Sequence, residues 1–261
     1  MSAVQLVDTH CHLDHHDRLS VATQVERARA AGVVAMMTVG TDLASSNQAL
    51  AAARRFDDVH AVVGIHPNDA MEATDEVLAV IDRLAGDEHV VGVGETGLDQ
   101  YRDWTTPAQQ EASFRAHIEI ARRRDRTLVI HCRDAWDDCL AILDDAGAPE
   151  RVVMHCFSGD LDVTRRCTEA GWYLSFAGNV TFRNADALRL AAAAAPAELL
   201  LTETDSPFLT PHPHRGTPND PSHVGLTLEV LAQVRGQDPE ALAPQVLANT
   251  QRAFALPGGS W

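Results

Sequence analysis

Lysine is absent from this chain of 261 residues, so all 21 basic side chains are arginines. Long apolar runs are absent too, although 45% of the residues are hydrophobic, and no segment is expected to cross a bilayer. A basic segment followed by an apolar stretch is missing near the N-terminus, which predicts a cytoplasmic protein without a signal peptide. The five cysteines form no CxxC pair, which argues against a disulfide framework and fits a reducing compartment.

The balance of charge is strongly acidic, with a formal net charge of -16 at pH 7. At long range, such a charge opposes the binding of a polyanion such as DNA. A function in nucleic-acid binding therefore requires local positive charge, from metal ions or from clustered arginines.

Short apolar, β-branched runs alternate with segments that repeat apolar residues every three or four positions, which is the pattern of strands alternating with helices. The expected strands span 6–13, 33–39, 60–65, 90–94, 127–131, 152–156, 172–176 and 199–203. The expected helices span 21–31, 45–56, 75–85, 107–124, 135–146, 161–170, 185–195, 222–235 and 239–254.

Eight strands that alternate with helices predict a parallel sheet, and eight such units are the number that closes a (β/α)8 TIM barrel. An open doubly wound sheet is the alternative. No linker or repeat interrupts the pattern, so we expect a single domain over residues 1–261. Because a barrel pairs its own strand edges, a monomer without a stable protein partner is expected.

Two histidines, His10 and His12, follow the first apolar run. Side chains two positions apart on a strand point to the same side, so both imidazoles face one point while Cys11 faces away. In a barrel, the C-terminal ends of the strands converge on one side, where the chemistry is found. The ligand-type side chains at those ends are His10, His12, His66, Glu95, His131, His155 and Asp205.

Four imidazoles and two carboxylates suffice for two divalent metal ions that share a bridging carboxylate and a water or hydroxide. We expect His10, His12 and Asp205 on the first ion, the histidines that end strands five and six on the second, and Glu95 between them. A carboxylated lysine cannot form the bridge, because the chain has no lysine.

Three cysteines adjoin these histidines and are expected to pack toward the surrounding helices: Cys11, Cys132 and Cys156. The ligands are then nitrogen and oxygen atoms, compatible with Mg, Mn, Zn, Co or Ni.

Six motifs of these residues lie in order along the chain: Asp-Thr-His-Cys-His-Leu-Asp at 8–14, Gly-Ile-His-Pro at 64–67, Gly-Glu-Thr-Gly-Leu-Asp at 94–99, Ile-His-Cys-Arg-Asp-Ala at 130–135, His-Cys-Phe-Ser-Gly at 155–159 and Glu-Thr-Asp-Ser-Pro at 203–207. In these motifs, and in the late Arg215-Gly216, Asn219 and Pro221, the chain resembles the TatD-type deoxyribonucleases of the amidohydrolase superfamily. The resemblance implies a barrel that hydrolyses phosphodiester bonds with divalent metals, typically from the 3′ end of DNA. The resemblance also implies the metal ligands of the family, which correspond to His10, His12, Glu95, His131, His155 and Asp205.

The predicted function is therefore a 3′–5′ deoxyribonuclease that acts on single-stranded DNA with a water activated by two metal ions. Asp205 is expected to take the proton from that water. Glu203 is two residues earlier on the same strand and is expected to be a neighbouring partner, a second base or a carboxylate paired with arginine. With the same metal centre, the chain could instead hydrolyse a small phosphoester, an amide or an aminoacyl-tRNA ester. A non-catalytic barrel for metal storage or protein interaction is the third interpretation.

Five residues on the same rim are expected to contact DNA: His66, Tyr101, Arg102, Arg133 and Arg215. The histidine would hydrogen-bond a phosphate, or else only cap its own loop. The arginines would contact phosphates or pair with neighbouring aspartates, and the tyrosine would stack on an unpaired base or merely cover the barrel. Gln100 and Thr217-Pro218 depart from the family pattern and affect substrate preference. The arginine run at 122–126 suits the C-terminus of a helix, and we do not assign it to nucleic-acid binding.

Overall fold

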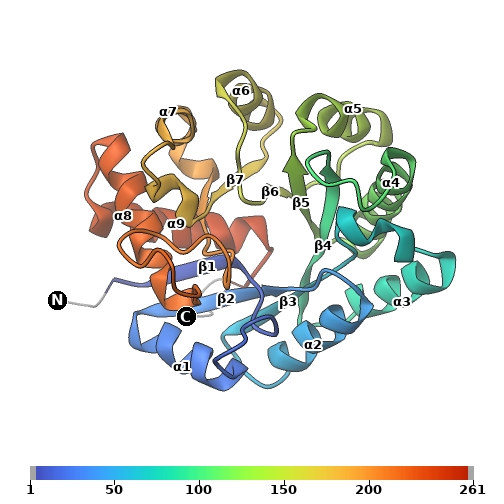
Figure 1. Cartoon of the computed structure of the whole chain (residues 1–261), viewed down its shortest axis with the longest axis horizontal. Helices are drawn as coiled ribbons and strands as arrows, with labels where there is room; N and C mark the ends of the chain where they lie inside the picture. Colours follow the sequence, from blue (N-terminus) through green and yellow to red (C-terminus); the bar gives the residue numbers. More distant parts are fainter. Residues whose placement is uncertain (1–3, 258–261) are drawn as a thin grey trace. The chain divides into compact units, whose positions relative to one another are not determined.

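The computed structural model describes residues 4–257, and Figure 1 labels its elements. The strands are β1 (Leu6–Cys11), β2 (Val33–Val39), β3 (Val59–Val63), β4 (Val90–Asp99), β5 (Thr127–Arg133), β6 (Val152–Met154), β7 (Tyr173–Phe176) and β8 (Leu200–Thr202). The α-helices are α1 (Val21–Ala30), α2 (Leu43–Ala53), α3 (Asp75–Ala85), α4 (Pro107–Arg124), α5 (Trp136–Ala146), α6 (Leu161–Glu169), α7 (Asp186–Ala194), α8 (Val224–Arg235) and α9 (Pro239–Ala253). Short 3₁₀ helices are η1 (Pro67–Glu72), η2 (Gly178–Thr181), η3 (Ala197–Leu199) and η4 (Pro221–His223).

The strand order in the eight-stranded sheet is the order of the sequence, β1 through β8. Sequential order with a helix in every connection is that of a (β/α)8 barrel, whereas a doubly wound sheet reverses its order at a switch point. The expected fold class is confirmed, and the doubly wound alternative is excluded. Across residues 4–257, no helix combines the length and the apolar character that crossing a membrane would need.

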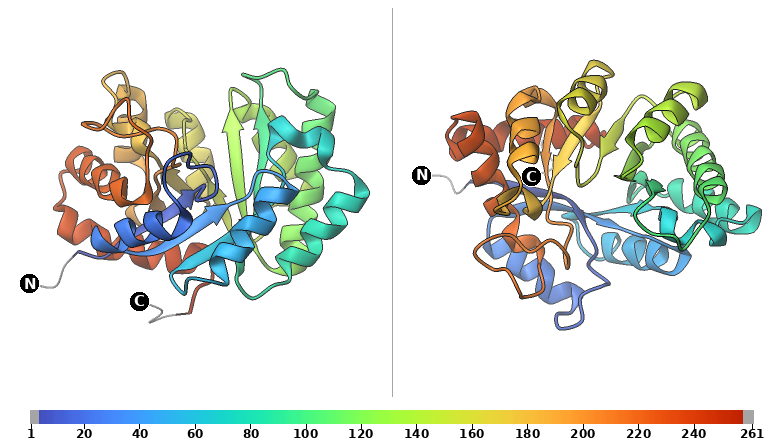
Figure 2. Two further views of the ribbon diagram at one scale, coloured as in Figure 1. Left: turned by 60° about the horizontal axis from the view of Figure 1, so that its bottom comes forward. Right: turned by 45° about the horizontal axis from the view of Figure 1, so that its top comes forward.

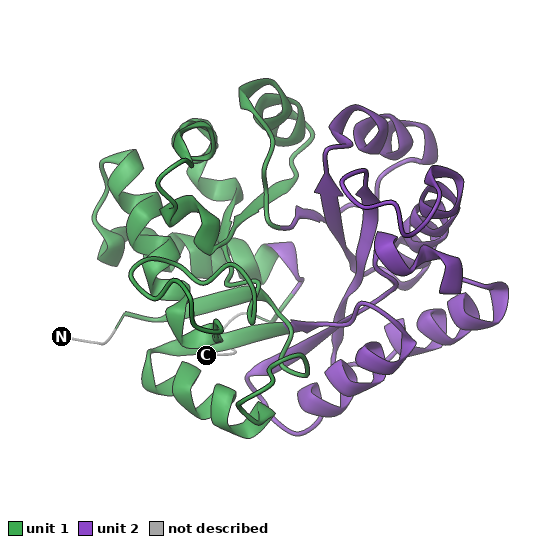
Figure 3. Cartoon of the chain, in the orientation of Figure 1, with its two compact units in different colours: residues 1–37, 156–252, 256–261 green, residues 38–155, 253–255 purple. Residues whose placement is uncertain are grey.

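The chain divides into two compact units, which Figure 3 colours separately. Among the described residues, the first comprises 4–37, 156–252 and 256–257, and the second comprises 38–155 and 253–255. The interpretation of residues 1–261 as a single domain stays a prediction.

In the second unit, β3, β4, β5 and β6 pair in parallel. Helix α2 lies against β3, and α4 lies against β4 (Figure 2). Apolar side chains of both kinds of element form a core in which Val62, Val93, Ile130, Phe114 and Ile118 are fully buried. This packing anchors the ends of β4 and β5, which carry candidate site residues.

In the first unit, β7 and β8 pair in parallel, and β1 lies beside β8. Thr9 in β1 donates a hydrogen bond to the backbone oxygen of Thr202, and its hydroxyl lies 2.8 Å from that of Ser175 in β7. Phe157 and Phe176 pack edge to face in the core of this unit. These contacts fix β1, whose last residues include His10.

Strands β4 and β5 extend beyond their expected ends, to Asp99 and Arg133. The pairing shifts register after Val93 and then continues, with Gly97 opposite His131. A Cβ atom on Gly97 would collide with the backbone oxygen of His131, so only glycine permits this close approach. Glu95 therefore lies inside β4 rather than after it, and His131 lies two residues before the end of β5, so the predicted clustering of site residues at the ends of the strands is confirmed.

Other elements end or begin slightly differently from the expectation. Strands β1, β3, β6 and β8 end earlier than expected, so His12, His66, His155 and Asp205 lie in loops that follow strands. Helix α2 begins at Leu43 rather than at residue 45, because Asp42 caps it through a hydrogen bond from the backbone N–H of Ser45.

The arginine run at 122–126 makes contacts within the second unit. Arg123 and Arg124 both donate to the carboxylate of Asp82. Arg126 donates to the backbone oxygens of Ala85 and Asp87. These arginines secure the C-terminal end of α4, as expected.

Candidate metal sites

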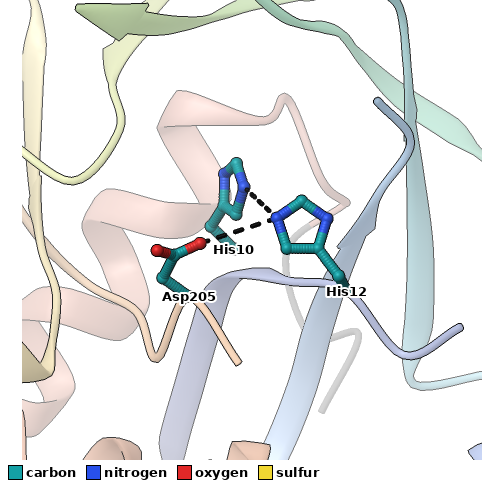
Figure 4. A group of neighbouring side chains, drawn as sticks. All are labelled: His10, His12 and Asp205. Atoms are coloured by element: carbon teal, nitrogen blue, oxygen red, sulfur yellow. Dashed lines mark hydrogen bonds and ion pairs between the residues drawn. The ribbon is translucent and has the colours of Figure 1, made fainter. Parts of the chain in front are cut away.

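The first unit brings His10, His12 and Asp205 together at the ends of β1 and β8 (Figure 4). His12 Nε2 lies 3.3 Å from His10 Nε2 and 3.5 Å from Asp205 Oδ1. Ligand atoms at about 2.0–2.2 Å from a tetrahedral ion are roughly 3.3–3.6 Å apart. The distances and the donor atoms therefore fit one shared divalent ion.

Backbone hydrogen bonds hold these ligands in place. The N–H of Asp205 donates to the oxygen of His10 at 2.9 Å, and the N–H of His12 donates to the oxygen of Ser206 at 2.7 Å. Asp205 adopts a left-handed conformation (φ 54°), which aspartate tolerates better than most residues. The loop after β8 is thus fastened directly to the end of β1.

Asp8 supports the same arrangement, although the sequence analysis assigned it no role. Its carboxylate accepts hydrogen bonds from the backbone N–H of Thr204 at 2.9 Å and from that of His10 at 3.3 Å. Complete burial raises the pKa of Asp8 to about 8, although these hydrogen bonds act in the opposite direction. The alternation of side chains on β1, which places Asp8 on the same side as His10, was the signal available in the sequence.

Glu203 is fully buried, and its Oε1 accepts the backbone N–H of Cys156 at 2.9 Å. Cys156 lies outside any strand and has a left-handed backbone (φ 43°), so the alternation argument applied to it was wrong. Cys11 fits that argument, since its thiol lies buried and donates to the backbone oxygen of Met37.

In the second unit, three imidazoles surround Glu95. Its Oε1 lies 2.8 Å from His131 Nδ1, 3.3 Å from His155 Nε2 and 3.5 Å from His66 Nε2. Glu95 itself is almost completely buried, as its 3% exposed fraction shows. A carboxylate oxygen among imidazole nitrogens is a donor set that divalent transition metals accept.

A backbone contact fixes the tautomer of the neutral His66 ring. Its Nδ1 accepts the backbone N–H of Asn68 at 3.0 Å, so the neutral ring carries its hydrogen on Nε2. An Nε2–H group donates hydrogen bonds and cannot bind a metal ion at the same time. This contact favours the expected hydrogen-bonding role of His66 over a role as ligand.

Asp99 is a further member of the second group. Its Oδ2 lies 3.2 Å from His131 Nε2, and its Oδ1 accepts the backbone N–H groups of Tyr101 and Arg102. Burial alone would lower the pKa of His131, but its hydrogen bonds with Asp99 and Glu95 outweigh burial and raise that pKa to about 9. The two carboxylates therefore create a local environment that favours a cation. The last residue of the Gly-Glu-Thr-Gly-Leu-Asp motif was the sequence signal for Asp99.

Three of the expected substrate contacts, together with Trp104, form an alternating stack that we call the cation–aromatic ladder: Arg133, Tyr101, Arg102 and Trp104. The Arg133 guanidinium lies 3.7 Å from the centre of the Tyr101 ring. The Arg102 guanidinium lies 5.3 Å from the Tyr101 ring and 5.1 Å from that of Trp104. The exposed fractions of Tyr101 and Trp104 are 58% and 59%, so both rings are accessible to a ligand.

Arg215, the remaining expected substrate contact, lies in the first unit. Its guanidinium is 4.0 Å from the centre of the Phe182 ring, and its Nη1 donates to the backbone oxygen of Thr210. These contacts order the loop after β8, while contact of Arg215 with substrate stays a prediction.

Comparison with known proteins adds independent information. The model of the family "TatD related DNase" matches residues 7–255. A protein of Mycobacterium tuberculosis named as an uncharacterized metal-dependent hydrolase, TatD, is 43% identical over 96% of this chain and 98% of its own. A protein of Cronobacter sakazakii named 3′–5′ ssDNA/RNA exonuclease TatD is 38% identical over 92% of each chain. The structure of YJJV, a TatD homologue of Escherichia coli K12, has a TM-score of 0.91 at 28% identity and covers 97% of this chain and 99% of its own.

Proposed function

Since this chain belongs to the TatD family of metal-dependent hydrolases, we propose that it hydrolyses phosphodiester bonds and removes nucleotides from the 3′ end of single-stranded DNA. The observation that carries this proposal is the pair of ligand groups at strand ends, one in each unit. The name of the Cronobacter relative supports nucleic acid as the substrate.

Each ligand group would hold a divalent ion, with Mg, Mn and Zn as the candidates. Such ions lower the pKa of bound water and neutralise charge on phosphoryl oxygens. His10, His12 and Asp205 would hold one ion in the first unit, and Glu95, His131 and His155 would hold one in the second. The bridging position of Glu95 stays a prediction.

Asp205 is the residue that we assign to proton transfer. Its side chain is 14% exposed, against 3% for His12, so one carboxylate oxygen can bind the ion while the other meets an attacking water. Glu203 is buried, and its Oε1 accepts a hydrogen bond from the backbone N–H of Cys156. We therefore assign Glu203 to positioning the loop after β6 rather than to proton transfer.

The cation–aromatic ladder would bind the DNA strand. Exposed rings stack on unpaired bases of any sequence, and guanidinium groups contact phosphates. Arg102 and Arg133 thus supply the local positive charge that a chain of net charge -16 needs in order to bind a polyanion. Small phosphoesters and amides offer no row of bases and phosphates to such a ladder, so the ladder favours a nucleic-acid substrate over these small molecules. His66 would donate its Nε2–H to a phosphate oxygen.

Cleavage of end-labelled DNA tests this function. The protein would be stripped of metal, supplied with Mg, Mn or Zn, and incubated with single strands labelled at the 3′ or the 5′ end. We expect metal-dependent release of the 3′ label as a mononucleotide. Glu95→Gln should abolish the release, because it removes a charged ligand without changing the size of the side chain.

Two outcomes would contradict the proposal. Release of the 5′ label first would reverse the polarity. Absence of cleavage with every metal, while metal analysis still finds bound ions, would favour the hydrolase of small phosphoesters, amides or aminoacyl-tRNA esters, which a panel of small esters would then identify.

A further inference from the structure

A groove of 690 Å³ lies in the first unit, lined by residues from the segment 16–19, from helix α1 and from the loop at 214–223 that leads into α8. Its volume is within the range of sites that bind small organic molecules. No candidate metal ligand and none of the five predicted DNA contacts lines it, although Thr217 and Pro218, which depart from the family pattern, do. It is therefore a separate candidate binding site.

The groove carries an excess of basic side chains. Arg18, Arg27, His16, His214 and His223 line it, against one carboxylate, Asp220. The two oxygens of that carboxylate are engaged, because one accepts from Arg27 Nη1 at 2.8 Å and the other from the backbone N–H of Ser222 at 3.0 Å. Arg18 is exposed and forms no ion pair within residues 4–257. With Arg27 paired to Asp220, the lining offers the Arg18 guanidinium together with imidazole groups, a set of donors that favours an anionic ligand.

His16 adds a hydrogen-bond donor. Its Nδ1 accepts the backbone N–H groups of Arg18 and Leu19, each at 3.0 Å, so the neutral ring carries its hydrogen on Nε2. An imidazole N–H beside a guanidinium is a suitable pair of donors for a phosphate group.

A pair of stacked imidazoles adds a flat surface. The His214 and His223 rings lie 4.5 Å apart and are within 11° of parallel. Asn219 Oδ1 accepts the Nδ1–H of His223, and the Asn219 amide nitrogen donates to the backbone oxygens of Thr204 and Phe208. This network fixes the orientation of the inner ring and leaves His214, an exposed residue, as the outer ring of the stack. Imidazole rings stack on nucleic-acid bases.

The groove is also connected by short segments to the ligands of the first unit. His12 precedes His16 by four residues, and the loop that begins at Asp205 continues to His214. Asn219 binds the oxygen of Thr204, the residue before Asp205.

From these observations we propose that the groove binds a phosphate and its adjoining base, as a nucleotide subsite for a part of the DNA strand remote from the bond that is cleaved. This inference rests on the proposed nuclease function. The same chemistry would suit a free mononucleotide, and binding measurements distinguish such a ligand from a nucleotide within the strand.

Binding can be measured apart from cleavage with a fluorescent single strand of about 12 nucleotides whose phosphorothioate linkages resist hydrolysis. Arg18→Glu should weaken binding of this strand by roughly tenfold or more and reduce its dependence on salt, because one phosphate contact is lost. His214→Ala should weaken it by about fivefold or more, through loss of stacking. Arg29→Glu on the same helix makes the same change of charge outside the groove and should bind as the wild type does.

Cleavage of a dinucleotide provides the second measurement, since it is too short to reach a remote subsite. Arg18→Glu should leave the kcat for the dinucleotide unchanged while it raises the KM for the longer strand.

Equal binding by Arg18→Glu and Arg29→Glu would overturn the groove proposal, while DNA cleavage by the wild type would still support the nuclease function. Binding of dTMP as tight as that of the long strand, lost in Arg18→Glu, would overturn the strand subsite in favour of a free nucleotide. Failure of the wild type to cleave any DNA would overturn the nuclease function instead.

Discussion

At the scale of single residues, Asp99 connects a candidate metal ligand to a candidate substrate contact. One oxygen lies 3.2 Å from His131 Nε2, and the other accepts hydrogen bonds from the backbone N–H groups of Tyr101 and Arg102 in the cation–aromatic ladder. A carboxylate in this position fixes the ring of a metal-binding histidine and makes its other nitrogen a better ligand.

Replacement of this carboxylate should therefore weaken metal binding. We expect Asp99→Asn to lower the affinity for the metal by about 10- to 100-fold, as is typical for such partners of ligands. Competition with a chromogenic chelator would measure the affinity. Asp103→Asn, an exposed change in the same loop, is the matched control. Equal affinities of the two variants would exclude the positioning role of Asp99.

His117 is a second residue with a measurable consequence. It is fully buried in α4, where its Nδ1–H donates to the Ser113 oxygen at 2.7 Å and its Nε2 accepts the Ile65 N–H at 3.0 Å. Desolvation lowers the pKa of His117 to about 4, although the hydrogen bond to Ser113 opposes this shift. The folded protein therefore keeps this ring neutral at pH values where the unfolded chain protonates it.

The free energy of unfolding should consequently fall as the pH is lowered from about 6.5 to 4, because the unfolded state binds more protons in that window. Protonation of His117 in the unfolded state should by itself lower the free energy of unfolding by about 3 kcal/mol at pH 4, relative to neutral pH. Urea titrations at several pH values would measure it. His117→Gln should show a shallower loss of stability over the same window, and identical slopes for the two proteins would show that His117 does not titrate as stated.

At the scale of elements, the end of β5 and the end of α4 both carry arginines, but in different surroundings. Arg133 lies over an exposed tyrosine ring, whereas Arg123 donates to the carboxylate of Asp82. Charge alone does not distinguish these two sites. Their neighbours distinguish them, because only the site of Arg133 offers an aromatic ring for stacking beside the cation.

A matched pair of variants tests this distinction. Arg133→Ala should weaken binding of single-stranded DNA by about tenfold, through loss of a phosphate contact and of support for the stacking ring. Arg123→Ala should leave binding within about twofold, since its guanidinium belongs to a structural ion pair. Fluorescence anisotropy at constant salt would compare them. A larger loss of DNA affinity for Arg123→Ala than for Arg133→Ala would instead identify the end of α4 as the nucleic-acid surface.

At the scale of the whole molecule, metal binding should contribute to stability. An ion that binds only the folded chain adds about 2.7 kcal/mol when its concentration is a hundred times its Kd. For a chain of this size, chelation should therefore lower the Tm by roughly 5–10 °C, and added metal should restore it. Thermal scans with and without chelator would measure the shift. His10→Ala should reduce this shift in Tm, because it removes a ligand, whereas an unchanged Tm after verified metal removal would show that the ligand groups hold no stabilising ion.

Features that depend on local periodicity could be predicted from the order of residues alone. Alternation along a strand places His10 and His12 on one side, and the succession of strand and helix patterns predicts the fold class. The order of the motifs indicates the family. These features need only the spacing of residues along the chain, which the sequence contains completely.

Features that depend on neighbours distant in the sequence could not be predicted in this way and follow from the folded chain. The pairing of β4 with β5 resumes at Thr96 and places Glu95 inside a strand, although the apolar pattern of the sequence ends at Gly94. The backbone N–H of Asn68 selects the tautomer of His66, and Asp99 meets His131 across two strands. The basic groove exists because the loop at 214–223 packs on α1, nearly 200 residues away along the chain. Such contacts are set by register and packing, which no local pattern encodes.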